Sequence, residues 1–263
     1  MIIAPQSAGR IGKSTAAEAI TAWLQFAGVD NVLLDLDAEH LTLSSRFPDS
    51  ATAYPEALRS EDGWARFMAA LTTVDVPAIV CDLPAQSTEF VLRQLTERRG
   101  LDLLEESGIR LTVLLFPAED TAARQSAIEC VRALGERADW IVVWQPGPKP
   151  LAEESEWAAS RLGARLRELR AMELRLPRLT RLTLEEVAKA VRRENRWLPL
   201  SEAIGKVGAV ARHELELWRN QALTGCGDAA EYLVSDPALV RSQTVRIAAP
   251  PAYQPSTGPV FDL

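Results

Sequence analysis

The sequence has few of the residues that build disulfide-linked secreted proteins or metal sites. Its 263 residues include three cysteines, Cys81, Cys130 and Cys226, and two histidines. Because three widely spaced cysteines form neither a disulfide framework nor a zinc motif, we expect a reducing environment. No apolar run reaches the roughly 18 residues of a membrane span, and the first residues lack a signal-peptide pattern. The sequence therefore predicts a cytoplasmic protein without a membrane anchor.

Lysine is also scarce, with four lysines against 25 arginines, and the net charge is −7. A negative net charge argues against a protein coated with positive charge for nucleic acid. The charge is uneven, however, since residues 161–196 contain eleven basic and five acidic side chains. This stretch predicts either a binding surface or a solvent-exposed helix face of paired charges, such as Glu168 with Arg165.

Short β-rich runs alternate with helical patterns along the first part of the chain. The expected strands are residues 2–4, 31–36, 78–81, 111–116 and 140–144, and residues 171–176 are compatible with one more. The expected helices are residues 13–27, 60–72, 86–106, 119–137, 152–170, 183–196 and 201–223. Continuously apolar strands separated by helices predict an α/β fold, with a mostly parallel sheet and helices on both of its faces.

The length of the chain suits one large domain or two small ones. We expect a single domain over residues 1–247, with an α/β core at 1–150 and a mainly helical C-terminal part at 151–235. Residues 248–263 are rich in proline and have no helical pattern, which predicts a flexible tail.

A glycine-containing loop lies between the first expected strand and the first expected helix. It reads Ser7-Ala8-Gly9-Arg10-Ile11-Gly12-Lys13-Ser14-Thr15. Glycines allow backbone N–H groups to turn toward a phosphate, and the start of a helix adds its positive dipole end. Lys13 then neutralises phosphate charge, and Ser14 offers its hydroxyl to Mg²⁺. The first glycine of the general P-loop pattern is replaced by Ser7, so an ordinary glycine turn at a helix start is the alternative.

Three carboxylates follow the second and third expected strands. Asp35 and Asp37 come at the end of Val32-Leu33-Leu34, and Asp82 follows Val80-Cys81. In a parallel α/β sheet, ligands bind beyond the carboxyl ends of the strands, so all three side chains are expected near the phosphate loop. Such carboxylates bind Mg²⁺ directly or through water. A single one of them is equally well explained as an aspartate that caps a strand end.

Taken in order, these motifs resemble the ParA/MinD family of P-loop ATPases over about residues 1–150. The family's loop Lys-Gly-Gly-x-Gly-Lys-[Ser/Thr] is similar to residues 8–14, its Asp-x-Asp-Pro-Gln to residues 35–39, and its Asp-x-Pro-[Pro/Ala]-Gly to residues 82–86. The resemblance implies a P-loop NTPase fold with ATP and Mg²⁺ as cofactors. Three positions depart from the pattern, because Ala8 replaces the signature lysine, and Arg10 and Gln86 each replace a glycine.

The resemblance also implies roles for individual residues. The phosphates would be held by Gly9, Arg10, Ile11, Gly12, Lys13, Ser14 and Thr15. Lys13, Asp37 and Asp82 would be catalytic, with Asp37 positioning the attacking water. Mg²⁺ would be held by Ser14, Asp35, Asp37 and Asp82, the last through water. Arg10 either replaces the missing lysine charge, since guanidinium pairs well with phosphate, or is a solvated loop residue.

The resulting hypothesis is an ATP-binding switch protein with slow hydrolysis, acting in DNA partition, plasmid transfer or intracellular positioning. The resemblance implies a nucleotide-dependent homodimer, although Ala8 removes the usual contact across it. Residues Arg161 to Arg196 are the candidate contact for nonspecific DNA or for a transfer or partition protein. Two alternatives remain: an ATP-dependent ligase or kinase for a small molecule, and a nucleotide-binding module without hydrolysis.

Overall fold

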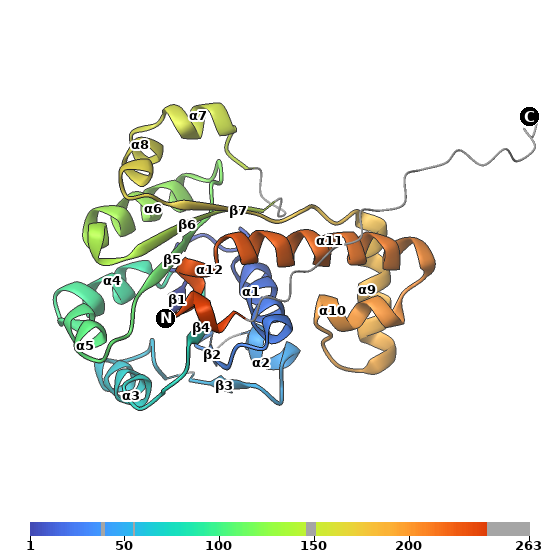
Figure 1. Ribbon diagram of the computed structural model, residues 1–263, viewed down its shortest axis with the longest axis horizontal. Helices are drawn as coiled ribbons and strands as arrows, with labels where there is room; N and C mark the ends of the chain where they lie inside the picture. The colour runs from blue at the N-terminus through green and yellow to red at the C-terminus, as the bar shows by residue number, and fades with distance from the viewer. Residues whose placement is uncertain (38–39, 55, 146–150, 241–263) are drawn as a thin grey trace, which may run out of the picture.

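The computed structural model describes residues 1–37, 40–54, 56–145 and 151–240. These residues form a seven-stranded sheet in the order β3-β2-β4-β1-β5-β6-β7, and each neighbouring pair is parallel. The strands are β1 (Ile2–Ile3), β2 (Asn31–Asp35), β3 (Ala51–Ala53), β4 (Ala78–Asp82), β5 (Thr112–Leu115), β6 (Asp139–Trp144) and β7 (Met172–Arg175). Helices pack on both faces (Figure 1), which confirms the predicted α/β fold. The tail predicted at residues 248–263 lies outside the described residues.

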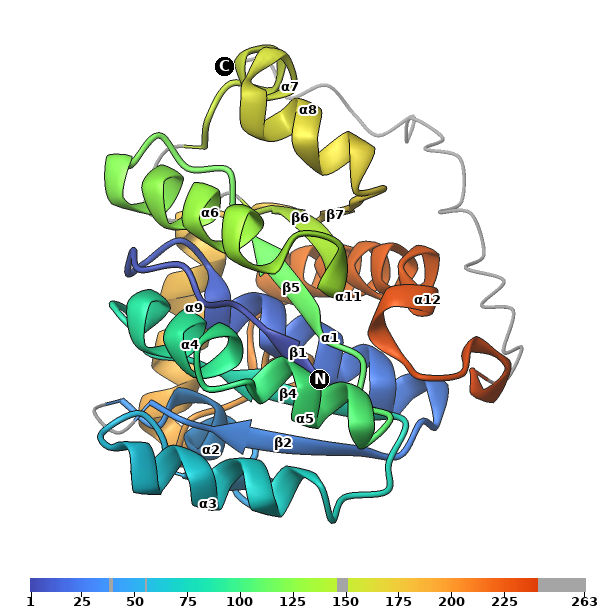
Figure 2. The same cartoon turned by 90° about the vertical axis from the view of Figure 1, so that its left-hand side faces the viewer.

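Two apolar cores, one on each face of the sheet, hold the layers together. Adjacent strand residues point to opposite faces, so Ile79 and Cys81 belong to one core and Ala78 and Val80 to the other. One face is covered by α1 (Lys13–Ala27), α2 (Thr42–Arg46), α11 (Ala209–Asp228) and α12 (Ala230–Leu233). The other face is covered by α3 (Glu61–Leu71), α4 (Thr88–Thr96), α5 (Gly100–Glu106), α6 (Thr121–Leu134), α7 (Glu154–Ala159) and α8 (Arg161–Glu168), as Figure 2 shows.

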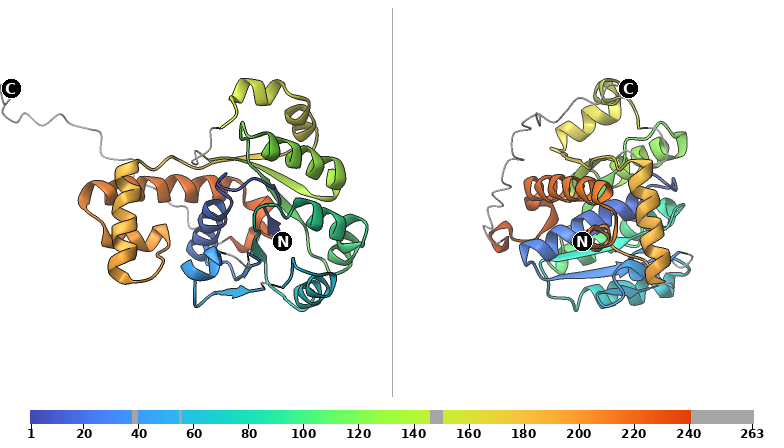
Figure 3. Two further views of the ribbon diagram at one scale, coloured as in Figure 1. Left: turned by 180° about the vertical axis from the view of Figure 1, so that it is seen from behind. Right: turned by 90° about the vertical axis from the view of Figure 1, so that its right-hand side faces the viewer.

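A helical extension lies to one side of the sheet, beyond α1. It consists of α9 (Arg181–Glu194) and α10 (Leu200–Ala203), drawn in orange, and it packs against the first half of α11 (Figures 1 and 3). A small separate core holds it together, formed by Ala190, Leu198, Ala203, Val207, Ala211 and Leu215. Short 3₁₀ turns occur at Gly135–Arg137, Ile204–Lys206 and Pro237–Leu239. No described helix is both long and apolar enough to cross a membrane.

Several predicted helix boundaries are wrong, among them that of the helix expected at 201–223, which is divided into α10 and α11 because Val207 and Gly208 are extended. The single helix expected at 86–106 is two helices, because Arg99 adopts a left-handed φ of 59° between them. The helix expected at 152–170 is also divided, because Ser160 is extended and its hydroxyl accepts from the amide of Gly163 at 3.0 Å. The short elements α2 and β3 were not predicted, since five and three residues are too few to show a periodic pattern.

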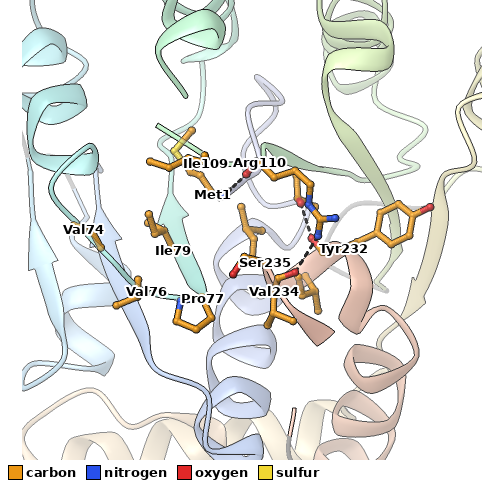
Figure 4. A pocket seen from close by; sticks show the side chains of 14 residues that line it. Met1, Val74, Val76, Pro77, Ile79, Ile109, Arg110, Tyr232, Val234 and Ser235 are labelled. Atoms are coloured by element: carbon orange, nitrogen blue, oxygen red, sulfur yellow. Dashed lines mark hydrogen bonds between the residues drawn. The ribbon is translucent and has the colours of Figure 1, made fainter. Parts of the chain in front are cut away.

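Hydrogen bonds attach α12 and the residue that follows it to the amino ends of the strands. The guanidinium of Arg110 donates to the carbonyl of Val234 at 3.0 Å, and the Thr112 hydroxyl donates to the carbonyl of Tyr232 at 2.5 Å. A cavity of only about 50 Å³ remains among these residues (Figure 4). This edge is therefore closed by structural contacts.

The opposite, carboxyl edge of the sheet contains a topological switch point. Strand β1 lies between β4 and β5, and the chain leaves β1 toward β2 but leaves β4 toward β5, on the other side of β1. The loops that follow β1 and β4 therefore start out in opposite directions, which opens a crevice where α/β proteins bind ligands. The predicted phosphate loop follows β1, and Asp82 ends β4.

Candidate functional site

The loop after β1 ends in a tight turn at Gly12, where α1 begins. Gly12 has a φ of 103°, and a Cβ atom there would lie 2.6 Å from the Cδ and Oε1 atoms of Gln145. The backbone therefore favours glycine at this position, and any larger residue would also have to displace the end of the Gln145 side chain. The N–H groups of the first turn of α1 have no partner within the helix, so this turn presents donors and a positive dipole end to the crevice.

Lys13 crosses from the start of α1 to the loop after β4. Its Nζ donates to the carbonyls of Gln6 at 2.9 Å and Pro84 at 3.0 Å, and the residue is buried. Burial lowers the pKa of Lys13 to about 8, and the negative charges of Asp82 and Asp37 oppose this shift. Lys13 is therefore a partly desolvated cation, held beside two carboxylates and between two loops.

Asp82 is a buried carboxylate at the end of β4. Burial raises its pKa to about 6, whereas a hydrogen bond with Ser14 lowers it and the neighbouring charges of Asp35 and Asp37 raise it. Asp35 is paired in register with Asp82 on the neighbouring strand β2. The hydroxyl predicted to hold Mg²⁺ and the carboxylate predicted to support it are thus in direct contact.

Asp35 and Asp37 differ in what their side chains do. The two oxygens of Asp35 accept from the amides of Asp37 at 3.1 Å and Ser44 at 2.8 Å, so this fully buried carboxylate fixes the chain that follows β2. Asp37 is also buried, and its Oδ1 accepts from the amide of His40 at 3.1 Å. Within the part of the chain that the structure describes, no three His, Cys, Asp or Glu side chains form a ready metal cluster.

The predicted site residues lie together at the carboxyl edge, although they come from three segments of the chain. Lys13 and Ser14 begin α1, Asp35 and Asp37 follow β2, and Asp82 ends β4. The remaining loop residues differ in exposure: Ile11 and Ala8 are buried, Gly9 and Thr15 are half-buried, and Arg10 is exposed.

Two positions where the resembled family has glycine keep the backbone that favours glycine. Arg10 has a φ of 62° and Gln86 a φ of 63°, both in the left-handed region. The amide of Gln86 donates to the carbonyl of Ser7 at 2.9 Å, which joins the loop after β4 to the phosphate loop. Both residues therefore hold a left-handed backbone with a side chain larger than that of glycine, at a strain of roughly 1 kcal/mol for each.

Five of the eleven basic side chains at 161–196 form ion pairs with neighbouring carboxylates. The ion pairs are Arg165 with Glu168 and Glu136, Arg175 with Glu154 and Glu173, Arg181 with Glu185, Lys189 with Glu186, and Arg196 with Glu202. They lie on exposed surfaces of α8, β7 and α9. The predicted pair of Glu168 with Arg165 is confirmed, whereas the other six basic side chains form no ion pair among the described residues, so contact with DNA or a protein stays a prediction.

Two glutamines near the loop were not predicted from the sequence. The side chain of Gln6 is fully buried and donates to the carbonyls of Phe116 at 3.2 Å and Ala123 at 2.9 Å, which anchors the loop to β5 and α6. Gln145 follows β6 and lies against Gly12. Each is a polar residue soon after an apolar strand, the same signal that identified the aspartates.

Comparisons with known proteins give structural matches of low similarity. No family model matches the chain, and no curated protein matches it. A solved structure, the MinC:MinD cell division protein complex of Aquifex aeolicus, matches with 13% identity and a TM-score of 0.41, covering 84% of this chain and 93% of the other. Similarity at this level leaves the function to be argued from the residues of the chain itself.

Proposed function

We propose that this chain is an ATP-binding switch protein of the ParA/MinD type. It binds ATP with Mg²⁺ at residues 7–15, hydrolyses it slowly, and acts in DNA partition, plasmid transfer or intracellular positioning. The observation that carries the proposal is the meeting of Lys13, Ser14 and Asp82 in the crevice between the loops after β1 and β4. A buried ammonium, a hydroxyl and unpaired helix amides form a donor set suited to a polyphosphate.

The residues present fit a magnesium nucleotide. Gly12 has no side chain that would fill the turn of the loop. Lys13 supplies a positive charge, and its attraction to a phosphate is stronger in a buried site than in water. Ser14 and Asp82 already form a hydroxyl–carboxylate pair. Mg²⁺ usually binds through one or two carboxylates together with phosphates, and it would neutralise phosphate charge.

The carboxylates take different parts in this proposal. Asp82 supports the metal through water, and Asp37 positions the attacking water. Both oxygens of Asp35 are occupied by backbone amides, so we assign it to positioning the segment that carries Asp37 rather than to direct metal binding. Ala8 is buried and short, so the chain binds nucleotide without the signature lysine. The same observation favours a second candidate, a nucleotide-binding module that does not hydrolyse.

The partners that we propose depend on the nucleotide-driven ordering of two loops. Ordering of the loops after Asp37 and Asp82 around the nucleotide would drive association into a homodimer or docking of a DNA-transfer or partition protein. Because five of the eleven basic side chains of residues 161–196 already form ion pairs, we expect weak, salt-sensitive contact with DNA at most.

The test is Mg·ATP binding measured by calorimetry for the wild type, Lys13→Ala and a control, Lys206→Ala. Lys206 pairs with Glu194 at 2.8 Å on the helical extension, far from the loop in sequence. We expect Lys13→Ala to lose binding and Lys206→Ala to keep it. Equal affinity in Lys13→Ala and the wild type would exclude the proposal. Phosphate release that Asp37→Ala abolishes would separate the slow ATPase from the module that does not hydrolyse.

A further inference from the structure

Glu18 is a buried carboxylate that contacts two parts of the molecule outside its own helix. It lies in α1, about one turn after the residues of the phosphate loop, and its side chain is 2% exposed. Its Oε2 accepts from the guanidinium of Arg46, the last residue of α2, and its Oε1 accepts from the amide of Leu200, the first residue of α10. A single side chain therefore joins α2 to the helical extension.

The segment that ends at Arg46 begins at the candidate nucleotide site. The side chain of Asp37 accepts from the amide of His40 at 3.1 Å, and that of Asp35 accepts from the amide of Ser44 at 2.8 Å. Because α2 is only five residues long, a change at either aspartate would reach Arg46 within one or two helical turns.

The helical extension is organised as a unit with its own small core. Leu179 and Leu200 are partly buried side chains that pack against both this core and the main one on the same face of the sheet. A cavity of about 700 Å³ lies between α9 and the start of α1. The extension lies beside α1 and α2 (Figures 1 and 3), so contacts at α10 help to set its position.

We propose that Glu18 is a positioning residue that couples the nucleotide site to the helical extension. A buried carboxylate that loses a partner is costly, so Glu18 has to follow when Arg46 moves. A shift of α2 therefore changes the hydrogen bond to the amide of Leu200, because one carboxylate holds both groups. In the proposed function, on which this coupling rests, Asp37 positions the attacking water, and its bond to the amide of His40 changes when nucleotide binds. The extension then takes different positions in the nucleotide-bound and the nucleotide-free protein.

Hydrogen–deuterium exchange of the full chain, with and without Mg·ATP, tests the coupling at residues 40–47 and 198–206. In the wild type we expect Mg·ATP to change the exchange rates of both segments by about fivefold or more, as is typical of coupled sites. Glu18→Gln should keep ATP binding, because the side chain of Glu18 bonds to α2 and α10. A glutamine has one acceptor oxygen, so it cannot hold Arg46 and the amide of Leu200 on separate oxygens, and the response of residues 198–206 should be lost.

Two further variants separate the coupling from a general effect on stability. Arg46→Lys keeps a charge for Glu18, so residues 198–206 should respond to Mg·ATP as they do in the wild type. Glu61→Gln removes a carboxylate from an exposed ion pair with Arg98, and this matched control should change nothing. Exchange in α6, on the other face of the sheet from α1, is the internal reference in every variant.

A response of residues 198–206 that persists in Glu18→Gln, or that is absent in the wild type although ATP binds, would overturn the proposal. If ATP does not bind at all, the proposed function fails, and the nucleotide-free protein decides whether Glu18 links α2 to the extension. In that state Arg46→Met should raise exchange at residues 198–206 by about fivefold or more relative to α6. Equal relative exchange in Arg46→Met and the wild type would overturn the link.

Discussion

Lys13 and Pro84 are 71 residues apart in the sequence, and the Nζ of Lys13 donates to the carbonyl of Pro84 at 3.0 Å. This bond links the first residue of α1 to the loop that follows Asp82. A phosphate in the loop would attract the same ammonium group, so binding would weaken its link to Pro84. The loop after β4 would then be free to rearrange, which gives the proposed switch a physical basis in a single side chain.

Replacing Lys13 with methionine is expected to stabilise the nucleotide-free protein while it abolishes ATP binding. The pKa of Lys13 falls from 10.5 to about 8 on folding, which corresponds to a cost of about 3 kcal/mol for burying the charge at neutral pH. Part of this gain is lost with the hydrogen bonds to Gln6 and Pro84, so we expect a net gain of about 1 kcal/mol in urea unfolding. Lys206→Met, on an exposed ion pair, is the matched control and should leave both quantities unchanged. Loss of stability in Lys13→Met would show that this lysine has a structural role.

Nucleotide affinity is expected to fall as the pH rises through about 8. A bound phosphate keeps Lys13 protonated, so its pKa in the complex lies above the value of about 8 in the free protein. Between these two values the complex holds more protons than the free protein, and binding therefore takes up protons. Calorimetry at pH 8.5 in buffers of different ionisation enthalpy measures this uptake directly. Proton release, or none, would contradict the assignment of Lys13 to the phosphates.

Much of the site could be predicted because its residues follow apolar strands in order. The apolar runs before Asp35 and Asp82 predicted where their strands end, and parallel strands bring their carboxyl ends to one edge of the sheet. The different hydrogen bonds of Asp35 and Asp37 could not be predicted from the sequence. Asp35 accepts from the amide of Ser44, which lies in α2, a helix too short to show a periodic apolar pattern. Gln145 was missed because its contact with Gly12 joins segments more than a hundred residues apart.

The helical extension was less predictable than the sheet. Strands and long helices have periodic apolar patterns, whereas α9 and α10 are organised by a small core that includes Ala190 and Ala203. Because alanines give a weak hydrophobic signal, the sequence predicted the helices of this region but not which part of the molecule they pack against. The cavity beside α9 was equally hidden, since residues from α1, α2, α11 and the position after β6 complete it.

Gly12→Ala is expected to cost about 2 kcal/mol or more and to prevent nucleotide binding. The new Cβ would be strained at a φ of 103° and would lie 2.6 Å from the Gln145 side chain. Gly28→Ala is the matched control, at the other end of α1: its φ is 66°, and a Cβ there meets nothing within 4 Å. We expect about 1 kcal/mol for this change, from backbone strain alone, with binding retained. Thermal unfolding with and without Mg·ATP distinguishes the two variants. Equal losses of stability in both would contradict a close contact between residue 12 and the Gln145 side chain.

Arg46→Met is expected to destabilise the protein strongly, because Glu18 would remain buried without its partner. Glu18 lies in α1, its side chain is 2% exposed, and it also accepts a hydrogen bond from the amide of Leu200. Removing one partner of a buried pair costs roughly 3–5 kcal/mol. Burial already raises the pKa of Glu18, and the loss of Arg46 raises it further, so the deficit should be smaller at pH 5 than at pH 8.

The double variant Glu18→Gln with Arg46→Met removes the buried charge and should recover part of this loss in urea unfolding. Arg59→Met, in the exposed pair with Glu56, should have almost no effect. A deficit in Arg46→Met that is the same at both pH values would mean that Arg46 stabilises α2 through packing.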